Sequence, residues 1–121
     1  MNLRIPGPTP LPPEVIRAVG QQMINHRGPE FEAMFQEVTA WLKVFFETEN
    51  DVYLLTSSGT GGMEAAVVNT LSPRDRVLAV SVGVFGDRFA RIAEAYGAEV
   101  TRLTFPAGQA ADPERVAANI G

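Results

Sequence analysis

The stretch Asp51–Leu71 most strongly limits what this chain can fold into. Its sequence is DVYLLTSSGTGGMEAAVVNTL. The apolar run Val52–Leu55 predicts a short buried strand, and Thr56–Gly62 predicts a polar, glycine-rich turn after it. The apolar residues that then recur at helical spacing are Met63, Ala66, Val67 and Leu71. We therefore predict a strand, a glycine turn and a helix in this order.

This order of elements can hold a phosphate. The first N–H groups of a helix lack intrahelical partners, and the helix dipole is positive at that end. Ser57, Ser58 and Thr60 could add hydroxyl donors. The turn is neither a Walker A sequence nor a GxGxxG fingerprint, because no lysine follows the glycines and no acid ends the next strand. A plain tight turn therefore stays open as the alternative.

The charge and composition of the chain exclude several classes of protein. The 121 residues carry a net charge of −4, so no basic face is available for broad nucleic-acid binding. There is no cysteine, which excludes disulfides, Cys-based zinc sites and thiol chemistry. No apolar run reaches membrane-spanning length, and the N-terminal residues do not resemble a signal peptide. We expect a cytoplasmic protein without membrane, nucleic-acid or metal partners.

The remaining pattern predicts an α/β fold with mainly parallel strands. The first 13 residues, with five prolines in IPGPTPLPP, predict an extended arm. Strand and helix alternate after residue 50, which is typical of parallel sheets with ligands beyond the carboxyl ends of the strands. The other expected elements are helices at Pro13–Ile24, Pro29–Phe46 and Asp87–Tyr96, strands at Val77–Val82 and Val100–Phe105, a C-cap at Gly97 and a final helix capped by Asp112.

Several segments resemble class V pyridoxal-phosphate (PLP) aminotransferases, most closely the alanine–glyoxylate and serine–pyruvate group. These segments are PGPTPLPPEV, HRGPEF and LLTSSGTGGMEAAVVNTLSPRDRVLAVSVGVFGDRFA. The resemblance implies the first part of an aspartate-aminotransferase-type (PLP fold type I) large domain. It divides the chain into an arm with a first helix, 1–24, and an incomplete PLP-binding domain, 25–121. It also implies a homodimer that transfers an amino group between a small amino acid and a 2-oxo acid such as glyoxylate or pyruvate.

The resemblance also assigns cofactor-binding residues. The residues that match the family's phosphate-binding positions are Ser58, Gly59, Thr60 and Gly61. Phe85, in the loop Ser81–Gly86, matches the aromatic residue that covers the pyridine ring, although several relatives carry Trp there. The residues alone favour the alternative, in which Phe85 is an ordinary loop aromatic that packs on the core. His26, in the connector before the second helix, is expected at a subunit contact.

The lysine that attaches PLP is expected to lie outside this sequence. Lys43 is the only lysine, and its position on the polar face of the second helix predicts a solvated side chain. The resemblance implies that this chain is the N-terminal third of an enzyme, inactive alone. It also implies that Val52–Leu55 does not pair directly with Val77–Val82. The arginines expected on solvated faces are Arg88, Arg91 and Arg102, of which Arg88 could add positive potential near the Phe85 loop.

Two alternative functions stay open. Class V also contains cysteine desulfurases and lyases, which the phosphate-binding residues alone do not separate from aminotransferases. A small α/β module that binds a phosphorylated ligand without catalysis would also fit a glycine turn before a helix.

Overall fold

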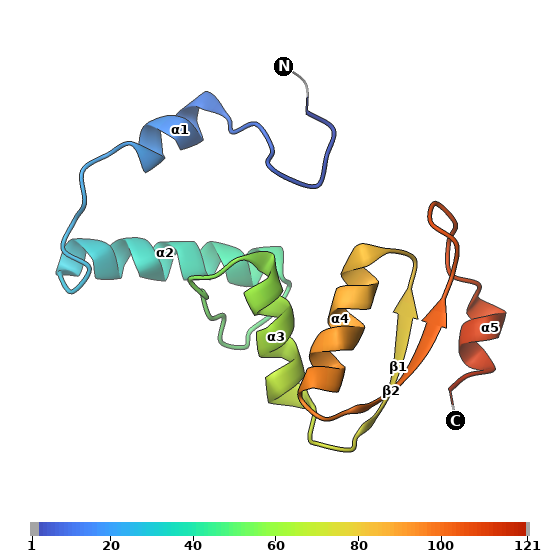
Figure 1. The fold of residues 1–121 in the computed structure, drawn as a ribbon. Coiled ribbons are helices and arrows are strands. Elements are labelled where there is room, and N and C mark those ends of the chain that lie inside the picture. Colours follow the sequence, from blue (N-terminus) through green and yellow to red (C-terminus); the bar gives the residue numbers. More distant parts are fainter. Residues whose placement is uncertain (1–2, 121) are drawn as a thin grey trace. The chain divides into compact units, whose positions relative to one another are not determined.

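Residues 3–120 are described by a computed structural model, in which two groups of elements follow each other along the chain (Figure 1). The chain divides into two units, Met1–Tyr53 and Leu54–Gly121. The first unit holds helices α1 (Pro13–Val19) and α2 (Pro29–Phe45). The second holds α3 (Gly59–Thr70), β1 (Arg76–Ser81), α4 (Val84–Ala95), β2 (Glu99–Thr104) and α5 (Pro113–Ala117). The division expected from the family, after residue 24, stays a prediction.

Helix α1 is shorter than predicted. Proline opens it at Pro13, as expected, but it ends at Val19 instead of Ile24. The Gly20 amide donates to the Ile16 carbonyl and closes the last turn. Beyond it, Met23 is 91% exposed, so no packing offsets the cost of continuing the helix past a glycine.

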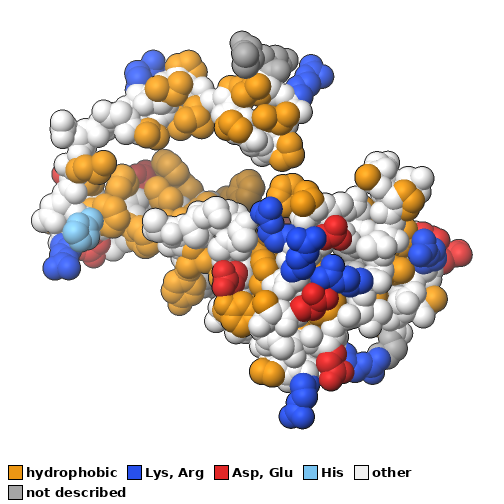
Figure 2. Space-filling model, viewed as in Figure 1, with side chains coloured by type: hydrophobic (Ala, Val, Ile, Leu, Met, Phe, Trp, Pro, Cys, Tyr) orange, Lys and Arg blue, Asp and Glu red, His pale blue; other side chains and the backbone are white. Residues whose placement is uncertain are grey.

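Helix α2 agrees with the prediction to within one residue, but its apolar face is not covered within the chain. None of its residues is buried. Figure 2 shows hydrophobic side chains at the surface of this part of the molecule. The most exposed large ones on α2 and its cap are Trp41, Val44, Phe45 and Phe46. The aromatic residues of α2 therefore form no core within residues 3–120.

The second unit is a parallel βαβ arrangement. Strands β1 and β2 pair in parallel, from Arg76 opposite Glu99 to Ser81 opposite Thr104. Helix α4 connects them and packs against both strands. It ends at Ala95 with Tyr96 as its C-cap, one residue before the predicted cap, and Gly97 follows with a φ of 87°, which suits that position. These observations confirm the predicted α/β class and place both strands within one residue of their expected limits.

Helix α5 begins as the sequence predicts. Asp112 is the N-cap, and its carboxylate accepts the Glu114 amide at 3.0 Å. The Arg115 guanidinium lies 4.6 Å from the centre of the Phe105 ring, at the end of β2.

The predicted buried strand Val52–Leu55 is wrong for this chain. The segment is neither helix nor strand, and Tyr53, Leu54 and Leu55 are 80%, 46% and 57% exposed. A strand needs a hydrogen-bonding neighbour, and within residues 3–120 the only ladder joins β1 to β2. Within residues 3–120, Val52–Leu55 does not pair with β1.

The core of the second unit is small. Its buried apolar residues are Val67, Ala90, Ala93 and Leu103. They join α3, α4 and β2, which fixes the two long helices of this unit relative to the sheet. Across the described range, every helix is too short or too polar to cross a membrane.

Candidate functional site

The predicted phosphate-binding residues lie in the first turn of α3. The helix begins at Gly59, four residues before the predicted start at Met63. Ser58 is the N-cap, with the extended backbone usual there. Its carbonyl accepts the Gly61 amide at 2.9 Å and the Gly62 amide at 3.4 Å, which closes the first turn. The glycines therefore belong to the helix rather than to a preceding loop.

The N-terminus of α3 presents donors without protein partners. Among the hydrogen bonds of residues 3–120, none is donated by the amides of Ser58, Gly59 or Thr60, and the Ser58 side chain does not cap the helix. The first turn also lacks an acidic residue that would offset the helix dipole. This concentration of positive potential and free N–H groups suits an anion.

Gly61 is required by the packing of its own turn. A Cβ at this position would lie 2.6 Å from Ser57 Oγ and 2.7 Å from Ser57 Cβ. Ser57 in turn donates to the Ser58 carbonyl at 3.0 Å. At Gly59 and Gly62, by contrast, a Cβ would meet nothing within 4 Å. Ser57 and Gly61 thus fix the approach of the chain to α3, and Gly59 leaves open space beside the free amides.

Phe85 lies in the first turn of α4. The prediction that it lies in a loop is wrong. The helix begins at Val84, three residues earlier than expected, and Gly83 is its N-cap. The Phe85 ring is 54% exposed. It does not pack into the core, so the alternative of a buried loop aromatic is wrong.

Buried Ser81 holds the start of α4. Its hydroxyl donates to Oδ1 of Asp87 at 2.7 Å and accepts the Gly83 amide at 3.3 Å. A Cβ on Gly86 would lie 2.8 Å from Ser81 Oγ and 2.9 Å from Ser81 Cα. Only glycine lets the first turn of α4 come this close to the end of β1, so the direction in which Phe85 emerges is fixed by the backbone.

Arg88 connects the two predicted parts of the site. Its Nη1 donates to Thr60 Oγ1 at 2.9 Å, and its guanidinium carbon lies 5.7 Å from the centre of the Phe85 ring. Arg88 is exposed, as expected, and its bond to Thr60 places its charge beside the predicted phosphate-binding residues. The spacing of three residues between Phe85 and Arg88, on one helix face, was a sequence signal for the contact between these two residues only.

Two further side-chain bonds fix the helices of this unit. Tyr96 donates to the Glu64 carboxylate across α3 and α4, and this bond raises the pKa of the Tyr96 phenol. Arg102 on β2 binds both oxygens of Glu94 at 2.8 and 2.7 Å, which lowers the pKa of Glu94. Arg102 is thus ion-paired on an exposed surface.

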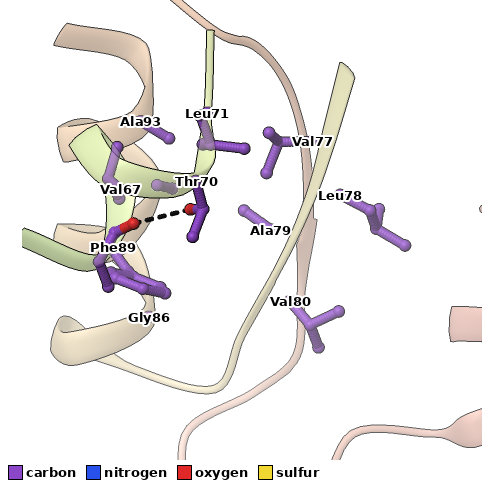
Figure 3. Close-up of a pocket in the computed structure, with 12 residues that line it drawn as sticks. Val67, Thr70, Leu71, Val77, Leu78, Ala79, Val80, Gly86, Phe89 and Ala93 are labelled. Atoms are coloured by element: carbon purple, nitrogen blue, oxygen red, sulfur yellow. Dashed lines mark hydrogen bonds between the residues drawn. The ribbon is translucent and has the colours of Figure 1, made fainter. Parts of the chain in front are cut away.

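An apolar cavity of about 280 Å³ lies between α3, α4 and β1 (Figure 3). Its labelled walls include Val67, Leu71, Val80 and Phe89, and it contains no charged side chain. The hydroxyl of Thr70 turns back to the Ala66 carbonyl at 2.7 Å, so it is already satisfied. The cavity is a gap in helix–sheet packing and does not suit a phosphate.

The other candidate residues lie in the first unit. Lys43 Nζ is 3.7 Å from Oδ1 of Asp51 and donates to the Glu49 carbonyl at 3.4 Å. Its side chain is one-third exposed. His26 borders a shallow apolar depression together with Phe31 and Met34.

Comparison with known proteins extends these observations. No family model matches the sequence. The chain is 44% identical over 117 residues to a "soluble hydrogenase 42 kDa subunit" of Anabaena cylindrica, a match that covers 97% of this chain and 30% of that protein. It is 40% identical over 112 residues to an L-aspartate–glyoxylate aminotransferase of Paracoccus denitrificans, covering 92% and 28% of the two chains.

A solved structure gives the same result for the fold. The aspartate aminotransferase of subgroup IV from Thermus thermophilus superposes with a TM-score of 0.86 at 39% identity, over 93% of this chain and 32% of that one. The chain thus spans about 30% of the length of the curated relatives it matches. It is a homologue of class V-type aminotransferases and shares the fold of about a third of the Thermus thermophilus enzyme.

Proposed function

We propose that the full-length protein containing this chain is a PLP-dependent transaminase. It would transfer an amino group between a small amino acid and a 2-oxo acid such as glyoxylate or pyruvate. Relatives named serine–glyoxylate and alanine–glyoxylate aminotransferase, 35% and 38% identical to this chain, support the substrate class. Two relatives carry the hydrogenase name, but the solved structures with which the chain superposes are titled aminotransferases.

One observation carries the proposal for this chain's own role. The free amides of Ser58, Gly59 and Thr60 lie at the positive end of α3, and Arg88 links Thr60 to the exposed ring of Phe85. An anion-binding turn and an exposed aromatic ring on adjacent helices are what a phosphorylated aromatic cofactor requires.

These residues fit PLP by their chemistry. The amides of the first turn and the Ser58 and Thr60 hydroxyls would hold the phosphate, and Gly59 and Gly61 keep that turn free of side chains. Phe85 would cover one face of the ring and exclude water from it. PLP, when bound, supplies the electron sink for reactions at the amino acid α-carbon. The contribution of this chain is binding, orientation and the exclusion of water.

We also propose that Lys43 is not the lysine that attaches the cofactor. Its ammonium group is engaged by Asp51 and the Glu49 carbonyl on the surface of its own unit. It is the only lysine of the 121 residues. The attaching lysine would therefore come from a part of the full-length protein outside this sequence.

The exposed face of α2 supports a homodimer. Trp41, Phe45 and Phe46 are 64%, 77% and 60% exposed, and aromatic residues of this kind are typical of interfaces. We propose that this face lies at the subunit contact, together with His26. The cytoplasmic location expected from the sequence stays a prediction.

The proposal is tested with the purified full-length protein. We expect a visible absorption band from bound PLP and transfer of the amino group from alanine, serine or aspartate to glyoxylate. Arg91→Gln, on α4 but outside the site, serves as the matched control and should not change either result. A protein that binds no PLP would contradict the proposal.

The same preparation separates the other functions. Release of sulfide from cysteine would identify a desulfurase, and binding of PLP without turnover of any amino acid would identify a binding module. Hydrogen uptake without amino-group transfer would favour the name carried by the Anabaena relative.

A further inference from the structure

We propose that Arg88 is a positioning residue that fixes the phosphate-binding turn of α3 relative to the aromatic cover on α4. This inference rests on the proposed function, since it names the residue that keeps two parts of that site together. Thr60 and Phe85 are 25 residues apart along the chain, and the Arg88 guanidinium lies beside both. Its Nη1 is 2.9 Å from Thr60 Oγ1, and its central carbon is 5.7 Å from the centre of the Phe85 ring.

The hydrogen bond to Thr60 sets the direction of its hydroxyl proton. Arg88 can only donate, so Thr60 Oγ1 is the acceptor. The proton of the hydroxyl must then point away from the guanidinium, and no acceptor for it is found among residues 3–120. It is thus available to an oxygen placed beside the free amides of Gly59 and Thr60.

The positive charge of Arg88 lies close to the positive end of α3 and so favours an anion beside it. A cation close to a helix N-terminus opposes the helix dipole, and the first turn of α3 has no acidic residue to compensate. Within residues 3–120 Arg88 makes no ion pair, and the nearest acid on its own helix, Asp87, is held by Ser81. A bound phosphate would relieve this arrangement.

The test is a double-mutant cycle on the cofactor-free full-length protein. We would titrate PLP into the wild type, Arg88→Met, Thr60→Val and the double variant, with calorimetric detection. Each single change should weaken binding by about tenfold, because each removes a charge-assisted hydrogen bond. The double variant should bind about as weakly as Thr60→Val alone, because Arg88 is proposed to act through the Thr60 hydroxyl.

Two further variants control this experiment. Arg91→Met removes an arginine one turn along α4 and should leave the PLP affinity within about twofold of the wild type. Arg88→Lys keeps the charge and one donor and should recover part of the lost affinity. If Arg88→Met does not fold, the same titration is made with Arg88→Lys and Arg88→Gln. Arg88→Gln should then lose more PLP affinity than Arg88→Lys.

The outcomes separate this inference from the proposed function. A wild type that binds no PLP overturns both. A wild type that binds PLP, with Arg88→Met within about twofold of it, overturns only the role of Arg88. Losses that multiply in the double variant would likewise show that Arg88 acts independently of Thr60.

Discussion

At the residue scale, the glycines of α3 have different roles although they follow each other within four positions. A side chain at Gly61 would clash with Ser57, whereas a Cβ at Gly62 would meet nothing within 4 Å. Gly59 also faces open space within this chain, but beside the amides that we propose bind phosphate. The sequence alone cannot distinguish them, because the difference depends on where Ser57 folds back.

We predict opposite effects on stability for Gly61→Ala and Gly62→Ala. Alanine at Gly62 should stabilise the full-length protein by roughly 0.5–1 kcal/mol, since it restricts the unfolded chain and favours the helix. Alanine at Gly61 should destabilise it by about 1–3 kcal/mol, because Ser57 must move. Chemical unfolding measures both, and equal stability of the two variants would contradict the predicted packing.

At the element scale, the sequence predicted the type of most elements but misplaced several ends. Periodicity identified α2, α4, β1 and β2, and turn chemistry identified Gly97 and Asp112. The sequence predicted the starts of α3 and α4 three to four residues too late, because the glycines before each apolar repeat are typical of turns. The amides of Gly59 and Thr60 can be identified as the unpaired amides of the first turn only when the start of α3 is known.

Prediction from the sequence failed mainly for residues whose structure depends on contacts between elements. Val52–Leu55 has the composition of a strand but no neighbouring strand within residues 3–120. Arg88 lies on the surface as expected, but its hydrogen bond to Thr60 could not be predicted, because the two residues are 28 positions apart. The family resemblance supplied the candidate site residues, and no pattern in the sequence alone would have joined them.

The bond between Tyr96 and Glu64 gives a prediction for the contact of α3 with α4. The pKa of Tyr96 is raised above 10.0, chiefly because its phenol donates to the carboxylate. The stabilisation is therefore complete below pH 10 and is lost as the pH rises through the raised pKa. The full-length wild type should be more stable than Tyr96→Phe at neutral pH, and the difference should shrink in alkali. Thermal unfolding across this range checks it, and a pH-independent difference would contradict it.

At the scale of the whole molecule, the chain leaves much apolar surface without partners. Only four apolar residues are buried among those described, and none of the large side chains is fully buried. One edge of β1 has no neighbouring strand within residues 3–120. Domains are stable by only about 5–15 kcal/mol, so unpaired backbone and uncovered apolar faces are significant losses.

We therefore predict that residues 1–121, expressed alone, do not form a stable monomer. They should aggregate or unfold gradually in denaturant, because the apolar faces of α2, α3 and β1 need further chain or a second subunit. The full-length protein is the control and should unfold cooperatively. A sharp transition from a monomer of the isolated 121 residues would show that this reasoning is wrong.

The central claim is that the first turn of α3 binds the phosphate of PLP, and one comparison tests it directly. The affinities of PLP and of pyridoxal, which lacks the phosphate, are measured for the full-length wild type and Thr60→Val. Thr60→Val should weaken PLP binding by about tenfold and pyridoxal binding clearly less, because pyridoxal has no phosphate to accept a hydrogen bond from the Thr60 hydroxyl. Equal effects on both compounds, or none on either, would contradict the claim.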